Sequence, residues 1–96
     1  MKNKPKTETE KSEEKRMNAI VKDMVKELAS ELCLNGILEE RIKCIDNAMA
    51  WSDGETTDYL VNSLPDPEKK YYMRNTPLFN AIFRMALQDE KNYIMD

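Results

Sequence analysis

Apolar side chains recur at steps of three and four residues along most of this chain, the spacing that places them on one face of an α-helix. The clearest stripe lies in the first half of the chain and consists of Met17, Ile20, Val21, Met24, Val25, Leu28 and Leu32. Charged residues occupy most of the positions between them. No segment shows the strict alternation of apolar and polar residues that a half-buried β-strand produces. The sequence therefore predicts an all-α protein.

The pattern predicts four helices, at about residues 12–34, 37–51, 54–64 and 77–93. Gly36 separates the first two, because glycine tolerates the left-handed conformation that commonly follows a helix. Ser52 and Glu55 have the spacing of a capping box at the start of the third helix. Asp53 is an alternative N-cap one residue later. We therefore expect a tight, polar turn between the second and third helices.

Prolines bound the elements in the last third of the chain. Pro65 and Pro67 end the third helix, because the residue before a proline avoids the helical region. Residues 68–73 are predicted to form no more than one loose turn. Thr76 and Pro77 then open the last helix, with threonine as its N-cap and proline at its first position.

The first sixteen residues carry six basic and four acidic side chains and no large apolar side chain after Met1. Such a segment buries too little surface to offset the entropy of ordering it. Residues 1–11 are predicted to be a disordered tail, although residues 8–16 could continue the first helix as a solvated extension. A single helical domain is expected over residues 12–96.

Composition excludes several kinds of functional site. Ninety-six residues allow one domain with a thin core. The chain has no histidine, which removes the commonest general base and metal ligand. Its two glycines are expected at helix ends, which leaves no phosphate-cradling loop. The acids near residues 46–58 lack the ligand spacing of an EF-hand. No catalytic, cofactor or metal site is therefore predicted.

The net charge and the cysteines indicate the setting in which the chain works. A net charge of −3 disfavours binding to nucleic acid, which needs clustered Lys and Arg. No apolar run is long enough to span a membrane, and no secretory signal precedes the first helix, so a cytoplasmic protein is expected. Cys33 and Cys44 are interpreted as reduced, partly buried thiols in that compartment. A disulfide between them stays open as the alternative.

The second and third predicted helices resemble the IDEAL domain, a short two-helix module of regulatory proteins from low-GC Gram-positive bacteria. The resemblance rests on Leu38, Ile42, Ile45, Asp46, Ala48, Met49, Asp53, Glu55, Leu60 and Leu64. Met49 stands where the family has leucine, and Thr57 stands where it usually has phenylalanine. The resemblance implies a bacterial regulator whose partner is a transcription factor or an assembly linked to controlled proteolysis.

The candidate interaction residues are apolar side chains near the last helix and two acids near the turn. The last helix is apolar around more than half of its circumference, so we expect part of it to be covered by a partner. The predicted apolar anchors are Trp51, Leu78, Phe79, Ile82 and Phe83. A homodimer through Phe79 and Phe83 is the simplest way to cover that face. Asp46 and Asp53 are either a solvated acid and a capping acid or an acidic patch that docks a basic partner.

These features predict a small non-catalytic regulator or adaptor that binds proteins through apolar helix faces. A phage or mobile-element inhibitor of a host protein is a close variant of this interpretation. The alternative from another class is a transcriptional regulator in which the second and third helices form a helix-turn-helix. Its recognition helix would carry Asp53, Glu55 and Asp58 and no basic residue, so phosphates would repel it. A nucleic-acid partner is therefore disfavoured.

Overall fold

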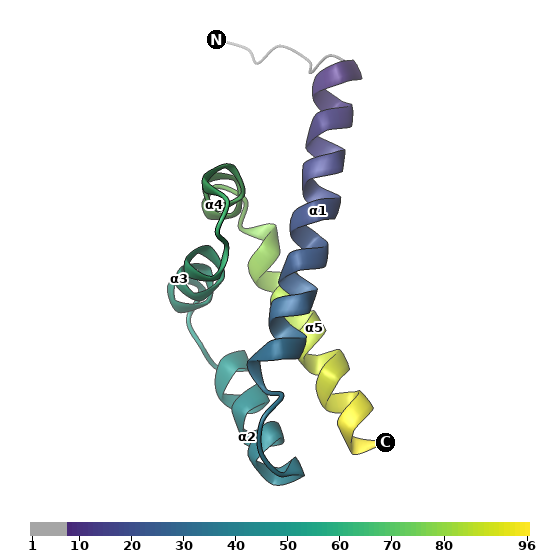
Figure 1. Ribbon diagram of the computed structural model, residues 1–96, viewed down its shortest axis with the longest axis vertical. Coiled ribbons are helices and arrows are strands. Elements are labelled where there is room, and N and C mark those ends of the chain that lie inside the picture. The colour runs from purple at the N-terminus through teal and green to yellow at the C-terminus, as the bar shows by residue number, and fades with distance from the viewer. Residues whose placement is uncertain (1–7) are drawn as a thin grey trace.

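The computed structural model describes residues 8–96, and in this part of the chain every regular element is a helix (Figure 1). The five helices are α1 (Glu8–Leu32), α2 (Leu38–Met49), α3 (Asp53–Ser63), α4 (Pro67–Arg74) and α5 (Leu78–Met95). The predicted all-α class is confirmed, whereas the predicted count of four helices is one too low. Residues 1–7 of the expected disordered tail lie outside the described residues.

The two longest helices, α1 and α5, cross and share the most extensive helix contact in the protein (Figure 1). Val21, Val25 and Ala29 of α1 lie four residues apart and are fully buried. They contribute to one core together with buried residues of α5. At the far end of the pair, Ser30 Oγ donates a hydrogen bond to Glu90 Oε1 at 2.9 Å. The helices α2, α3 and α4 lie along one side of this pair.

The N-terminal turns of α1 extend beyond the other helices (Figure 1). The helix begins at Glu8 rather than near residue 12, and residues 8–13 are exposed. This stretch is the solvated extension that the sequence allowed, because charged side chains with good helix propensity continue a helix without burying anything. The predicted boundary between tail and helix was therefore too late in the sequence.

The fourth helix replaces the loose turn expected at residues 68–73. Asp66 is its N-cap, and its Oδ1 accepts a hydrogen bond from the backbone N–H of Glu68 at 2.9 Å. Pro67 occupies the first helical position, where its missing N–H costs nothing. Met73 is buried in the core, which anchors this short helix. An Asp-Pro start signal was present in the sequence, but the two prolines were interpreted only as a helix stop.

The predicted capping box at the start of α3 is confirmed. Ser52 Oγ accepts a hydrogen bond from the N–H of Glu55, and the Glu55 carboxylate accepts one from the N–H of Ser52, each at 3.2 Å. The start of α5 differs from the prediction by one residue. Pro77 already has helical angles at the N-cap position, and no side chain caps the helix there.

The two cysteines form a disulfide that joins the end of α1 to α2. The prediction of two reduced thiols is therefore wrong for this structure, and the alternative holds. Cys33 follows the last residue of α1, and the chain reverses at Gly36, whose φ is +102°. This reversal brings Cys44 on α2 alongside Cys33, with the two Cα atoms 5.8 Å apart.

Candidate functional site

Phe79 and Phe83 lie in the core and not at the surface. Their exposed fractions are 1% and 0%. The interpretation of these rings as surface anchors is corrected, because α5 is a central helix. It contacts α1 on one side and α2 and α3 on the other, and the Tyr72 ring of α4 lies 5.9 Å from that of Phe79. An apolar circumference is what a helix surrounded by its own chain requires.

Trp51 packs against the buried aromatic residues at the turn between α2 and α3. Its ring stacks on that of Phe83, with centroids 6.2 Å apart and planes inclined by 11°. Tyr59 of α3 lies 5.3 Å from the Trp51 ring and 5.7 Å from the Phe83 ring. Trp51 is half-buried. Its ring therefore closes the core beneath the turn, and only part of it reaches the surface.

Asp46 and Asp53 each pair with a basic residue of α5. Lys91 Nζ lies 2.8 Å from Asp46 Oδ1, and an Arg84 Nη atom lies 2.7 Å from Asp53 Oδ1. Arg84 also donates to the backbone carbonyl of Trp51 at 3.1 Å. Both acids thus help to hold the α2–α3 turn on α5. Because their charges are compensated within the chain, they make a poor docking patch for a basic partner.

Arg84 and Lys91 were missed as partners of these acids by the sequence interpretation. They lie 31 and 45 residues from Asp53 and Asp46 along the chain, so no local spacing links them. The available signal was weak. Arg84 breaks the apolar run of the last helix, and a cation within such a face needs a compensating acid when it is partly buried.

Leu78 and Ile82 retain part of the role that the sequence predicted for them. Leu78, the first residue of α5, is 54% exposed. Ile82 is half-buried and lines a recess of about 180 Å³ beside exposed Met85. Leu78 and Ile82 do not share the buried face of α5 that carries Phe79 and Phe83. The predicted set of anchors therefore divides into core residues and surface residues.

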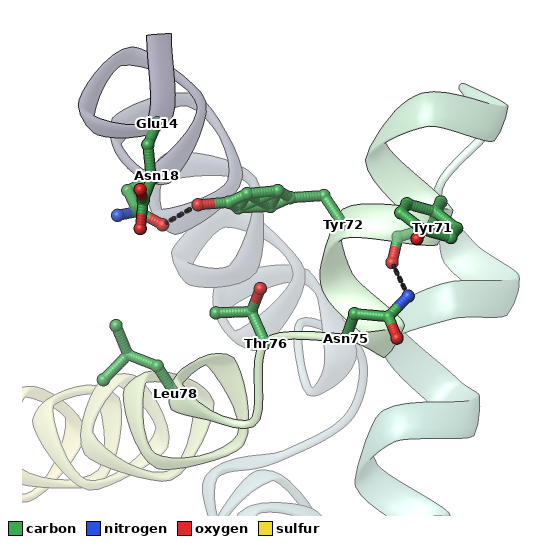
Figure 2. Close-up of a pocket in the computed structure, with 7 residues that line it drawn as sticks. All are labelled: Glu14, Asn18, Tyr71, Tyr72, Asn75, Thr76 and Leu78. Atoms are coloured by element: carbon green, nitrogen blue, oxygen red, sulfur yellow. Dashed lines mark hydrogen bonds between the residues drawn. The ribbon is translucent and has the colours of Figure 1, made fainter. Parts of the chain in front are cut away.

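Leu78 borders an open cavity of about 450 Å³ where α1, α4 and the start of α5 meet (Figure 2). Tyr72 reaches from α4 towards α1, and its hydroxyl donates a hydrogen bond to Asn18 Oδ1. On the opposite side of the cavity, Asn75 donates to the backbone carbonyl of Tyr71 at 2.8 Å, while the Tyr71 ring is largely exposed. The Tyr72–Asn18 hydrogen bond thus joins α4 to α1, and the Asn75 amide bonds the last turn of α4.

An exposed apolar surface that the sequence interpretation missed lies at the turn between α1 and α2. Leu34, Ile37 and Leu38 are 57%, 64% and 51% exposed, and we call them the apolar turn. The helical spacing of Leu38, Ile42, Ile45 and Met49 predicts that Leu38 lies on the core-facing stripe of α2, with Ile37 beside it. Ile37 is instead the N-cap of α2 and Leu38 its first residue, and both are exposed. Their position beside Gly36, where the chain reverses, was the feature of the sequence that could have indicated their exposure.

Among the described residues, Tyr59 has a clearly shifted pKa. Among residues 8–96, no group of three or more Cys, Asp or Glu side chains is placed to hold a metal ion. Burial raises the pKa of Tyr59, with a further rise from the Glu31 carboxylate, while a hydrogen bond with Ser63 lowers it. None of the helices in this range is both long enough and apolar enough to cross a membrane.

No family model, curated protein or solved structure matches this chain. The resemblance of residues 38–64 to the IDEAL domain therefore remains an expectation from the sequence. The candidate site rests on geometry alone.

Proposed function

We propose that this protein is a small non-catalytic regulator or adaptor that binds a protein partner, and that the apolar turn is its main contact surface. The observation that carries the proposal is the exposure of Leu34, Ile37 and Leu38. Three large aliphatic side chains, each more than half exposed within five residues, resemble the desolvated centre of an interface more than an ordinary surface loop.

The covalent and hydrogen-bonded surroundings of the apolar turn support this proposal. The Cys33–Cys44 disulfide closes the segment that contains Leu34, Ile37 and Leu38. Arg41 Nε donates to the carbonyl of Cys33 at 3.0 Å, within the same closed segment. A surface that is held in one conformation loses less entropy when it binds. The turn is therefore suited to recognition rather than left exposed on a mobile loop.

The sequence resemblance suggests which partners to examine. A transcription factor or a protease-linked assembly would fit a bacterial IDEAL-like regulator, and a host protein would fit a phage or mobile-element inhibitor. A helix-turn-helix function has less support, because α3 carries Asp53, Glu55 and Asp58 and no basic residue. A cytoplasmic location stays part of the proposal. The disulfide counts against it, because stable disulfides are rare in reducing compartments.

The test is affinity capture with matched variants, followed by mass spectrometry. Ile37 is the N-cap residue of α2 and Leu78 is the first residue of α5, so an aspartate is favourable for the helix at either position. Ile37→Asp and Leu78→Asp should therefore both fold. We expect Ile37→Asp to lose the captured partner and Leu78→Asp to retain it. The reverse result would move the interface to the cavity in Figure 2, and retention by both would exclude the apolar turn.

A further inference from the structure

A groove of about 180 Å³ runs between α1 and the end of α3. Its apolar floor is formed by Met24, Leu28 and Leu64, of which Leu64 is fully buried. Glu27, Glu31 and Ser63 complete the lining, and both glutamates are exposed. The groove is lined by apolar side chains at its base and by carboxylates at its rim, and no Lys or Arg lines it.

The two glutamates carry charges that the described chain does not compensate. Within residues 8–96, neither forms an ion pair, whereas Asp46 and Asp53 both do. Glu27 and Glu31 lie one helical turn apart, so their side chains are neighbours and their charges repel. The pKa of Tyr59 is raised mainly by burial, and the Glu31 charge adds to that rise. A cation placed between the two carboxylates would relieve this repulsion.

We propose that this groove binds a Lys or Arg side chain of a partner protein. The aliphatic stem lies over Met24, Leu28 and Leu64, and the cationic head lies between Glu27 and Glu31. Long basic side chains combine an apolar stem with a charged tip, and that combination matches the floor and the rim of the groove. The groove volume of about 180 Å³ suits one such side chain and is too small to enclose a whole helix.

The charge of the groove selects among possible occupants. A second copy related by two-fold symmetry would place Glu27 and Glu31 against the same residues of its partner, which is unfavourable. Phosphate-bearing ligands are repelled by the same carboxylates. A basic segment of another protein is the remaining class. This inference does not depend on the apolar turn, which lies at the end of α1 and is a separate surface.

The methionine methyl groups provide a direct readout of groove occupancy by NMR. Met24 lines the groove, while Met85 and Met95 are exposed elsewhere on α5 and serve as internal controls. The probe is a synthetic amphipathic helix with Leu on one face and Lys along its flanks, compared with the same peptide carrying Gln for Lys. We expect the Met24 signal to shift and saturate with the Lys peptide only. An unmoved Met24 signal would overturn the proposal.

Two double variants with the same change in net charge separate specific binding from general attraction. Glu27→Gln/Glu31→Gln removes the rim charges, and Glu39→Gln/Glu40→Gln removes two exposed acids on α2. Glutamine retains the helix propensity of glutamate, and circular dichroism checks that both variants fold. We expect the first variant to bind the Lys peptide with about tenfold lower affinity, because two exposed ion pairs are lost. The second variant should bind the peptide with nearly unchanged affinity.

Three results would overturn the proposal. Equal weakening by the two double variants would show that the peptide responds only to net charge. Binding that shifts Met85 and Met95 but not Met24 would place the cation elsewhere. A Met24 shift that appears on raising the protein concentration without peptide would assign the groove to a second copy. None of these results bears on the Ile37→Asp capture experiment, so the two proposals fail separately.

Discussion

The Arg84 side chain forms polar contacts with three different residues near the α2–α3 turn. It contacts the carboxylate of Asp53, the backbone carbonyl of Trp51 and, at 3.5 Å, the hydroxyl of Thr56. Thr56 is completely buried, and its own hydroxyl donates to the carbonyl of Ser52 at 3.1 Å. The neighbouring Asn80 donates to the carbonyl of Asp53 at 3.2 Å. Two backbone carbonyls of the turn, those of Trp51 and Asp53, thus accept hydrogen bonds from side chains of α5.

Replacing Arg84 with alanine should therefore cost more stability than removing its acid partner. We expect Arg84→Ala to lower the free energy of unfolding by about 1.5–3 kcal/mol, because it removes a charged donor from the Trp51 carbonyl. Asp53→Asn should cost less than about 1 kcal/mol, because the Asp53 side chain is 79% exposed and the pair is solvated. Urea denaturation of both variants measures the difference. Equal losses would show that the ion pair, and not the carbonyl contact, dominates.

Ser52 is the residue at which the local sequence predicted the structure most directly. Ser52→Ala removes the side-chain acceptor for the Glu55 N–H and should destabilise the protein by about 0.5–2 kcal/mol. Ser63→Ala is the matched control at the other end of α3, where the exposed hydroxyl donates to the Tyr59 carbonyl and caps no helix start. Its effect should stay within about 0.5 kcal/mol. A Ser52→Ala midpoint equal to that of Ser63→Ala would show that the cap contributes nothing measurable.

Among the described helices, α2 is held to its neighbours by both a disulfide and an ion pair. It packs on α5 through buried Ile45 and Ala48 and through the Lys91–Asp46 ion pair. Its link to α1 is the disulfide together with the hydrogen bond from Arg41. The disulfide therefore fixes how α1 and α2 meet, and with it the conformation of the apolar turn.

Reducing the disulfide should loosen α2. Bridging residues 11 apart is expected to contribute about 2–4 kcal/mol, so a reductant should lower the melting temperature by about 10 °C or more. A Cys33→Ala/Cys44→Ala variant should have the melting temperature of the reduced wild-type protein. Adding the reductant should not change the melting temperature of this variant. Thermal circular dichroism measures both. A wild-type melting temperature that does not change with the reductant would contradict this expectation.

Local signals predicted four of the five described helices and missed α4, and they could not predict contacts between distant helices. The Ser52–Glu55 spacing gave the α3 capping box, and the apolar stripe of α1 gave its buried face. The apolar circumference of α5 was ambiguous, because a central helix and an interface helix have the same composition. Phe83 was therefore misplaced, since its burial depends on Trp51 and Tyr59 arriving from another part of the chain. The disulfide depended in the same way on the chain reversal at Gly36.

The whole molecule is an elongated body of 52 × 24 × 24 Å with the apolar turn at one end. The C-terminal end of α5 lies towards the same end of the molecule (Figure 1), and the last four residues of that helix include exposed Tyr93 and Met95. The homodimer expected from the sequence depended on exposed phenylalanines, and both rings are covered within one chain. That reason for self-association no longer holds. Next to the apolar turn, Glu39 and Glu40 are exposed on the first turn of α2, and in a symmetric pair that buries the turn they would lie near the same residues of the second copy.

Light scattering should consequently give a mass near the 11.2 kDa of one chain at micromolar concentration. Like charges around the turn oppose self-pairing, and this opposition weakens as salt screens it. The measurement is therefore made at low and at high ionic strength. A mass near twice that value under both conditions would show that copies of this chain cover each other's apolar surface.

The central claim is that the apolar turn is the contact surface for a protein partner. Site-specific photo-crosslinking in the cells that make the protein tests it most directly, with a photoreactive phenylalanine analogue at Ile37 or, as the control, at Lys11. Lys11 is exposed in the first turn of α1, at the end of that helix far from the apolar turn. We predict one discrete adduct from position 37, none from position 11, and loss of the adduct when Leu34→Asp is added. No adduct from position 37, or the same adducts from both positions, would contradict the claim.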